Sequence, residues 1–286
     1  MMQGKSPAPH ATPPADDFLA TVRSCLRQRP RAIPPRFFYD AIGARLFDAI
    51  CATPEYYLTR TEIGILDQFC AQMVELIGSS CVLIELGCGS ATKTPLLLRH
   101  LADGALYVPI DICEPLLLQS AQRLRAMFPR IRVQPVCADY MRLPGLALDE
   151  IAGQRRVIFF PGSTIGNHTP DECIRLLRAA AQCLGSNGAM LVGVDCKKSP
   201  DLLNAAYNDA DGHTAAFNLN LLARMQRELG ARLDVDGFTH YAYYNAALGR
   251  IEMHLISRRA QLIRLPGESF RFEAGETIHT ENSYKY

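Results

Sequence analysis

The alternation of short apolar runs with helical stretches over residues 81–195 restricts the fold of this chain more than any other feature. Strands that alternate with helical patterns are typical of βαβ units, which build a parallel sheet. We therefore predict a doubly wound α/β core over residues 79–198. The predicted strands are 81–86, 106–110, 132–136, 156–160 and 189–194. The predicted helices between them are 94–100, 115–127 and 170–184, the last with Pro170 at its first position and a capping box of Thr169 and Glu172.

The segments on either side of this core follow a different pattern. Apolar residues recur at helical spacing over 18–78, which predicts three helices before the first strand, the last opening with a capping box of Thr59 and Glu62. After 199, two helical patterns lead into alternation at 239–246, 250–258 and 261–265, which predicts an antiparallel meander. We expect 18–78 and 199–286 to form a second, α+β, substrate-binding lobe, and the Pro/Ala-rich residues 1–17 to form a flexible tail.

Composition excludes several classes of protein. The 286 residues carry 30 Lys+Arg and 29 Asp+Glu, a net charge of +1, so we expect no nucleic-acid partner. No apolar run approaches the ~20 residues of a membrane-spanning helix, so we expect a cytoplasmic protein with no membrane partner. None of the ten cysteines forms a CxxC pair, so we expect reduced thiols and no metal. We also expect a monomer.

A glycine turn follows the first predicted strand, with Gly87 and Gly89 directly after Glu85 and Leu86. Glycines in such a turn let a ligand approach the backbone. The dinucleotide fingerprint G-x-G-x-x-G needs a third glycine for close helix–strand packing, but Thr92 stands there. The turn therefore predicts a cofactor site and disfavours a nicotinamide dinucleotide.

Acidic residues end the next two predicted strands. Asp111 could accept hydrogen bonds from both hydroxyls of a ribose, whereas Asp139 could accept one from an adenine amino group and Tyr140 could cover the ring. A strand-end aspartate is also a common turn former, so the argument depends on three features at successive strand ends. The acidic strand with its Gly-x-Gly turn resembles the first motif of class I S-adenosylmethionine (SAM) methyltransferases, which implies SAM as the cofactor.

Longer motifs carry a closer resemblance. Together they look like those of the ergothioneine-pathway L-histidine Nα-methyltransferase family, which is related to dimethylallyltryptophan N-methyltransferases. The resemblance implies an enzyme that trimethylates the α-amino group of L-histidine to hercynine with SAM. The motifs are residues 37–40, 46–48, 54–62, 85–94, 160–167 and 278–284.

The resemblance also implies which residues form the site. Asn167 and Tyr207 would hold the substrate carboxylate, and Glu281 and Ser283 would hold the imidazole. The family's cofactor contacts fall on Tyr39, Gly87, Lys93, Asp111, Asp139 and Tyr140, the last at a place often held by phenylalanine. Its substrate contacts fall on Tyr56, Gly162, Thr164, Asn167, Tyr207, Phe217, Glu281 and Ser283.

Methyl transfer from a sulfonium to an amine is an in-line displacement, which needs positioning rather than a covalent nucleophile. We expect the Gly162 carbonyl and Thr164 to orient the amine, and Tyr39, a water or bulk solvent to take its proton. Two alternatives stay open: the same fold acting on another amino acid such as a tryptophan derivative, and a truncated, inactive SAM-binding protein. The second arises because family members are expected to continue past Tyr286 with the last two strands of the sheet.

Overall fold

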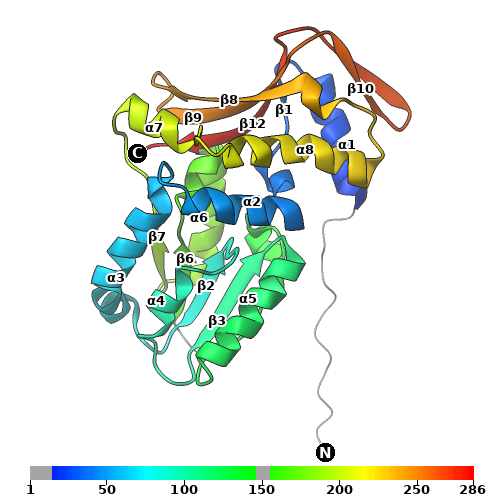
Figure 1. Cartoon of the computed structure of the whole chain (residues 1–286). Helices are drawn as coiled ribbons and strands as arrows, with labels where there is room; N and C mark the ends of the chain where they lie inside the picture. Colours follow the sequence, from blue (N-terminus) through cyan, green and yellow to red (C-terminus); the bar gives the residue numbers. More distant parts are fainter. Residues whose placement is uncertain (1–14, 146–154) are drawn as a thin grey trace, which may run out of the picture.

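Two lobes make up the computed structural model, which describes residues 15–145 and 155–286 (Figure 1). Most of the predicted flexible tail, residues 1–14, lies outside the described part, and the first helix, α1 (Ala15–Arg27), begins directly after it. None of the described helices is long and apolar enough to cross a membrane.

A parallel sheet forms the core of the lobe at the bottom of Figure 1. Its strands are β2 (Val82–Leu86), β3 (Leu106–Asp111), β4 (Arg132–Val133), β5 (Val136–Cys137), β6 (Arg156–Phe160) and β7 (Ala189–Val192). Their order is β4-β3-β2-β6-β7, with β5 also beside β3, and every pairing is parallel. This confirms the predicted doubly wound core. Strands are added on one side of β2 up to β5, and the chain then crosses to the other side of β2 to add β6 and β7. Sheets of this kind bind ligands at such a topological switch point, here between β2 and β6.

The third predicted strand, 132–136, is interrupted. The N–H of Gln134 still donates to the Tyr107 carbonyl at 2.9 Å, but Pro135 has no N–H to continue the ladder. The strand therefore divides into β4 and β5.

Helices cover both faces of this sheet. The helices α3 (Tyr57–Ile77), α4 (Thr94–Leu98) and α5 (Glu114–Met127) pack on one face, and α6 (Pro170–Leu184) packs on the other. Leu66 and Val74 of α3 are buried in this core, although we predicted from the sequence that residues 18–78 belong to the second lobe.

Two predicted capping boxes have opposite outcomes. The Thr169 hydroxyl accepts from Glu172 N–H while Glu172 accepts from Thr169 N–H, which confirms the box at the start of α6. The box of Thr59 and Glu62 is wrong: α3 begins at Tyr57, before Thr59, without a side-chain cap, and the Glu62 carboxylate binds Lys93 and the Gly162 N–H instead.

The second lobe packs helices against an antiparallel sheet. Besides α1, its helices are α2 (Ala41–Ala52), α7 (Pro200–Ala206) and α8 (His213–Leu229). Its strands are β1 (Arg31–Ala32), β8 (Phe238–Asn245), β9 (Arg250–Ser257), β10 (Gln261–Leu265), β11 (Glu268–Phe272) and β12 (Thr277–Tyr284), joined by the short 3₁₀ helices η1 (Pro35–Phe38) and η4 (Val235–Gly237). One apolar core connects residues from Phe18 to Leu58 with residues from Leu203 to Ile278.

The meander was predicted only in part. β8 and β9 pair as expected, but β10 leaves to form a separate hairpin with β11, and β12 takes the place beside β9. The two-residue strand β1 pairs parallel to β12. The expectation of three helices before any strand is therefore wrong, because β1 follows α1 directly.

The two lobes meet where β12 crosses the turn after β6. This turn contains η3 (Thr164–Asn167), and a Cβ added at Gly166 would lie 2.8 Å from the Tyr284 carbonyl oxygen. Beyond β12, Tyr286 N–H donates to the Asp195 carbonyl at 2.9 Å. These contacts hold the last strand of the second lobe against the loops that end the parallel strands.

Candidate active site

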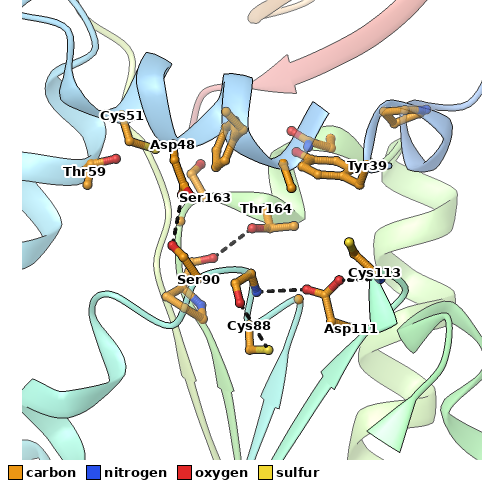
Figure 2. A pocket seen from close by; sticks show the side chains of 18 of the residues that line it. Tyr39, Asp48, Cys51, Thr59, Cys88, Ser90, Asp111, Cys113, Ser163 and Thr164 are labelled. Carbon is orange, nitrogen blue, oxygen red and sulfur yellow. Dashed lines mark hydrogen bonds between the residues drawn. The ribbon is translucent and has the colours of Figure 1, made fainter. Parts of the chain in front are cut away.

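A cavity of about 680 Å³ lies between the lobes, above the ends of the parallel strands (Figure 2). Figure 2 shows Tyr39, Asp48 and Cys51 on its upper side and Cys88 and Asp111 below. All residues implied by the family resemblance line it except Phe217: Tyr39, Tyr56, Gly87, Lys93, Asp111, Asp139, Tyr140, Gly162, Thr164, Asn167, Tyr207, Glu281 and Ser283.

Phe217 lies behind the wall of the cavity. Its side chain is only 2% exposed, and its ring centroid lies 5.6 Å from that of Tyr39 and 6.0 Å from that of Phe47. Phe217 does not line the cavity, so the structure does not bring it together with the other residues expected to contact substrate. Its apolar contacts instead fix the position of Tyr39.

The glycine turn fits the ribose of a nucleoside. Gly87 and Gly89 have φ of +70° and +51°, which side-chain-bearing residues rarely adopt. The turn brings Gly89 N–H to one oxygen of Asp111, at 2.8 Å, while Cys113 N–H donates to the other at 2.8 Å. Burial raises the pKa of Asp111, and these backbone donors oppose that rise. A carboxylate has about four acceptor positions, so these backbone donors leave room for a ribose hydroxyl.

The neighbouring strand end supplies a surface for a flat ring. Asp139 accepts a hydrogen bond from Met141 N–H at 2.9 Å. The Tyr140 hydroxyl lies 2.9 Å from His168 Nε2, and its ring packs edge-on against Phe160 at 5.4 Å. Tyr140 is thus held in place from two sides, as a residue covering an adenine requires.

Glu62 joins three parts of the site, and the sequence analysis missed this role. Its carboxylate accepts from Gly162 N–H at 2.8 and 2.9 Å and forms an ion pair with Lys93. Gly162 has φ +81°, and a Cβ there would lie 3.2 Å from Thr164 Oγ1 and 3.4 Å from Lys93 Nζ. No local motif signals this bridge, because its three members come from α3, the glycine-turn segment and the loop after β6.

The geometry distinguishes two of the expected catalytic residues. The Thr164 hydroxyl donates to the Pro161 carbonyl at 2.9 Å, so its oxygen can accept a hydrogen bond from an amine in the cavity. Burial raises the pKa of Tyr39 well above its ordinary value, with a further rise from the Glu281 charge. Tyr39 is therefore a neutral phenol at physiological pH, which is unsuited to take a proton from an ammonium.

An acid and a hydroxyl lie together on β12. Burial raises the pKa of Glu281 to about 8, although the charge of Lys285 opposes the rise. Ser283 accepts a hydrogen bond from the Tyr207 hydroxyl at 2.7 Å. The buried Lys285, which the sequence analysis also missed, donates to Ser283 at 2.9 Å.

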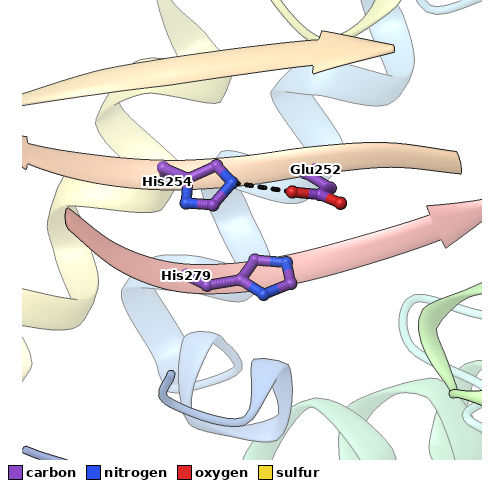
Figure 3. A group of neighbouring side chains, drawn as sticks. All are labelled: Glu252, His254 and His279. Carbon is purple, nitrogen blue, oxygen red and sulfur yellow. Dashed lines mark hydrogen bonds and ion pairs between the residues drawn. The ribbon is translucent and has the colours of Figure 1, made fainter. Parts of the chain in front are cut away.

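A second polar cluster lies outside this cavity (Figure 3). Potential ligand atoms of Glu252, His254 and His279 all lie within 4.8 Å of one another. The Glu252 carboxylate, however, already accepts from Arg250 at 2.7 Å and from the Tyr243 hydroxyl at 3.0 Å, and lies 3.1 Å from His254 Nε2. The acceptor positions of Glu252 are thus taken up by a structural network that includes a cation, and we assign no metal to this cluster.

Comparison with known proteins agrees with this geometry. The chain matches the model of a family described as histidine-specific, SAM-dependent methyltransferases over residues 18–286. The histidine N-alpha-methyltransferase of Mycolicibacterium smegmatis is 39% identical over 95% of this chain and 85% of its own length. The protein of the same name from Mycobacterium tuberculosis is 39% identical over 93% and 83%. Ergothioneine biosynthesis protein 1 of Neurospora crassa is 29% identical over 90% of this chain and 30% of its own length.

The match therefore includes both lobes and the residues of the cavity between them. It confirms the family resemblance carried by the sequence motifs, and with it SAM as the cofactor of a class I methyltransferase fold. The chain belongs to the family of SAM-dependent, histidine-specific methyltransferases.

Proposed function

We propose that the protein transfers methyl groups from SAM to the α-amino group of L-histidine, three in succession, and so forms hercynine for ergothioneine biosynthesis. The observation that carries this proposal is that one cavity contacts both the acidic strand ends suited to a nucleoside and the Glu281–Ser283 pair suited to an imidazole. Relatives that are 39% identical over almost the whole chain are named for histidine Nα-methylation, which supports the same acceptor.

Bound SAM supplies an activated methyl group on a sulfonium. The chain's own contribution is to hold the two reactants in line and to keep water away from them. Asp111 and Asp139 bind the nucleoside end, while the Glu62 carboxylate fixes both Lys93 and the Gly162 backbone beside the reacting centre. No residue has to form a covalent intermediate.

The acceptor amine must present a lone pair, so its ammonium has to lose a proton. Thr164 Oγ1 and the Gly162 carbonyl accept the remaining N–H groups and turn the lone pair toward the methyl group. Tyr39 stays a phenol and shapes the pocket, and the proton leaves through water to solvent. Partly methylated histidine keeps its imidazole and carboxylate, so it can bind again for the next transfer.

Mass spectrometry of the purified protein with SAM tests the proposal. L-histidine, L-tryptophan and prenylated tryptophan are supplied in separate reactions, and S-adenosylhomocysteine binding is measured by calorimetry on the same preparation. We expect one, two and then three methyl additions on histidine alone. A preparation that binds S-adenosylhomocysteine yet leaves histidine unmethylated would contradict the proposal.

A further inference from the structure

The strand β12 has one residue more than a regular pairing with β9 allows. His279 lies opposite His254 and Glu281 lies opposite Met253, so Thr280 is an extra residue between two pairs that would be neighbours in a regular ladder. Such an insertion is a β-bulge, and bulges re-aim the side chains that follow them. The residue that follows here is Glu281, which lines the cavity.

The bulge decides which side chains of β12 face the cavity. Side chains alternate between the two faces of a strand, and Glu252 and His279 lie together on the face away from the cavity (Figure 3). In a regular pairing, Glu281 would lie opposite Glu252 and share that face. With the bulge, Glu281 lies opposite Met253, whose side chain belongs to the apolar core. The one-residue shift thus turns Glu281, and with it the alternate residue Ser283, toward the cavity.

A side chain of α8 holds the bulge on the core face of the sheet. Thr280 is 1% exposed, and its hydroxyl lies 2.8 Å from Asn218 Oδ1 and 3.0 Å from the Met253 carbonyl oxygen. The amide group of the buried Asn218 donates in turn to the His254 carbonyl at 3.0 Å. These bonds give hydrogen-bond partners to carbonyl groups beside the inserted residue, where a bulge disrupts the ladder.

His279 holds the bulge from the opposite face. Its Nε2 lies 2.9 Å from the Glu281 carbonyl oxygen, and a carbonyl can only accept, so this nitrogen carries the hydrogen. The bond spans the inserted residue, from the residue before it to the residue after it. The imidazole also stacks on that of His254, with ring centroids 4.7 Å apart. The stacking fixes the ring in the position from which it reaches across the bulge.

We propose that His279 and Asn218 are positioning residues that clamp the bulge at Thr280. The clamped bulge in turn directs Glu281 and Ser283 into the cavity. This deepens the proposed function and rests on it, because these two side chains are the ones expected to meet the imidazole of the substrate. Neither clamp residue lines the cavity, so both act on the substrate through the course of β12.

Substitutions at two neighbouring rings separate this role from general structural support. His279→Phe keeps a ring that stacks on His254 but removes the N–H that reaches Glu281. His254→Phe is the matched control, because His254 Nε2 contacts the Glu252 side chain and its Nδ1 has no hydrogen-bond partner in the described structure. Burial lowers the pKa of both histidines, so both are neutral at pH 7.5 and neither substitution changes the charge.

Calorimetry at pH 7.5 gives the Kd of L-histidine in the presence of S-adenosylhomocysteine, and the Kd of S-adenosylhomocysteine alone. In His279→Phe, we expect the Kd of histidine to rise about 3- to 10-fold because one hydrogen bond no longer holds the bulge. The Kd of S-adenosylhomocysteine should not change, since the cofactor end of the cavity is formed by the parallel strands. His279→Gln should recover most of the loss, because its amide can again donate to the Glu281 carbonyl.

The control variant sets the limit of this test. His254→Phe should bind both ligands as the wild type does. An unchanged Kd of histidine in His279→Phe overturns the inference, and so does an equal loss in His254→Phe.

A second measurement asks whether His279 acts through the two cavity-facing residues. His279→Phe is added to a protein that already carries Glu281→Ala and Ser283→Ala, in which the aim of these side chains no longer matters. We expect the Kd of histidine to rise by less than about twofold further. Independent effects would multiply instead, and a loss as large as in the otherwise unaltered protein overturns the inference.

The clamp can also be tested without substrate. Backbone amides of β12 should exchange hydrogen faster in His279→Phe than in the wild type or in His254→Phe, because local opening of the strand becomes easier. Equal exchange in all three proteins overturns the inference even where the proposed function holds. Faster exchange, together with a wild type that binds S-adenosylhomocysteine but not histidine, contradicts the proposed function, and the clamp would then serve only the fold.

Discussion

The backbone N–H of Gly89 donates a hydrogen bond of 2.8 Å to the carboxylate of Asp111, across the ends of two neighbouring parallel strands. The bond ties the glycine turn to the acidic residue that the sequence assigns to the ribose. It also leaves the carboxylate buried, with backbone donors as its only hydrogen-bond partners among the described residues. The turn and the aspartate are therefore already joined in the arrangement that we propose for the cofactor site.

Replacing Asp111 by asparagine should weaken this site. Asparagine keeps the size, but one of its ends is a donor that opposes either Gly89 N–H or a ribose hydroxyl. We expect the Kd of S-adenosylhomocysteine to rise about 10- to 100-fold, as measured by calorimetry. Asp103→Asn, at an exposed pair with Arg130, is the control and should bind as the wild type does. Equal affinities in the two variants would exclude this role for Asp111.

Glu62→Gln should impair use of the cofactor. A glutamine cannot both accept from Gly162 N–H and neutralise Lys93. We expect the KM for SAM to rise about tenfold, with kcat also reduced because the Gly162 turn is less well held. Asp67→Asn lies on the same helix in an exposed pair with Arg99 and should change neither constant. Steady-state kinetics of both variants measure these constants. A normal KM and kcat in Glu62→Gln would show that the contacts of Glu62 with Lys93 and Gly162 are not needed for the reaction.

Comparing Gly162→Ala with Gly104→Ala separates the effect of backbone strain from that of crowding in the cavity. At φ +81° an alanine costs about 1–2 kcal/mol of folding free energy, and its Cβ would also press on Thr164 and Lys93. Gly104→Ala is matched, because Gly104 has φ +83° with no atom within 4 Å of an added Cβ. Chemical denaturation should show a similar loss of stability in both, but only Gly162→Ala should lose methyltransferase activity. Full activity in Gly162→Ala would mean that the turn tolerates the added group.

The pKa of Glu281 predicts how stability depends on pH. Burial raises this pKa from 4.5 to about 8, so between these values the folded state holds a proton that the unfolded state has released. This group therefore lowers the free energy of unfolding as the pH rises from about 4.5 to 8. Glu281→Gln removes that loss, so its melting temperature relative to the wild type should increase from pH 5 to pH 8.

Glu273→Gln is the control for this comparison, since Glu273 is exposed beside Arg271 and its melting temperature should parallel that of the wild type. Burial also raises the pKa of Glu85, to about 7, so Glu85 likewise lowers the free energy of unfolding as the pH rises. It is present in all three proteins, so its effect cancels in the comparison of their melting temperatures. A constant difference between Glu281→Gln and the wild type across this range would show that the pKa of Glu281 is not raised in the folded protein.

Local signals predicted the α/β core well. The helix α6 was located to the residue, because Thr169, Pro170 and Glu172 form a capping signal that needs no distant partner. The box of Thr59 and Glu62 has the same local form, but ties to Lys93 and Gly162 outcompete the cap. A sequence pattern alone does not distinguish these two cases.

Elements that depend on distant partners were predicted less well. β12 alternates weakly because its cavity-facing residues, Glu281 and Ser283, are polar, so its period of two is hidden. Lys285 reads as an ordinary surface lysine, since its partners Asp195 and Tyr207 lie far away in the sequence. Phe217 was placed in the site by resemblance, which does not show that its ring packs against those of Tyr39 and Phe47 without lining the cavity itself.

The pairing of β1 with β12 sets an order in which this protein can assemble. Arg31, buried at the start of the chain's second lobe, donates to Glu276, 245 residues further along. The parallel sheet needs only residues from Val82 to Val192, so it can form while the rest is still being synthesised. The helices α1 and α2 cannot complete their core until β12 has been synthesised, and such long-range contacts form slowly. We therefore expect the apolar residues of α1 and α2 to stay exposed until the strands that cover them have been synthesised.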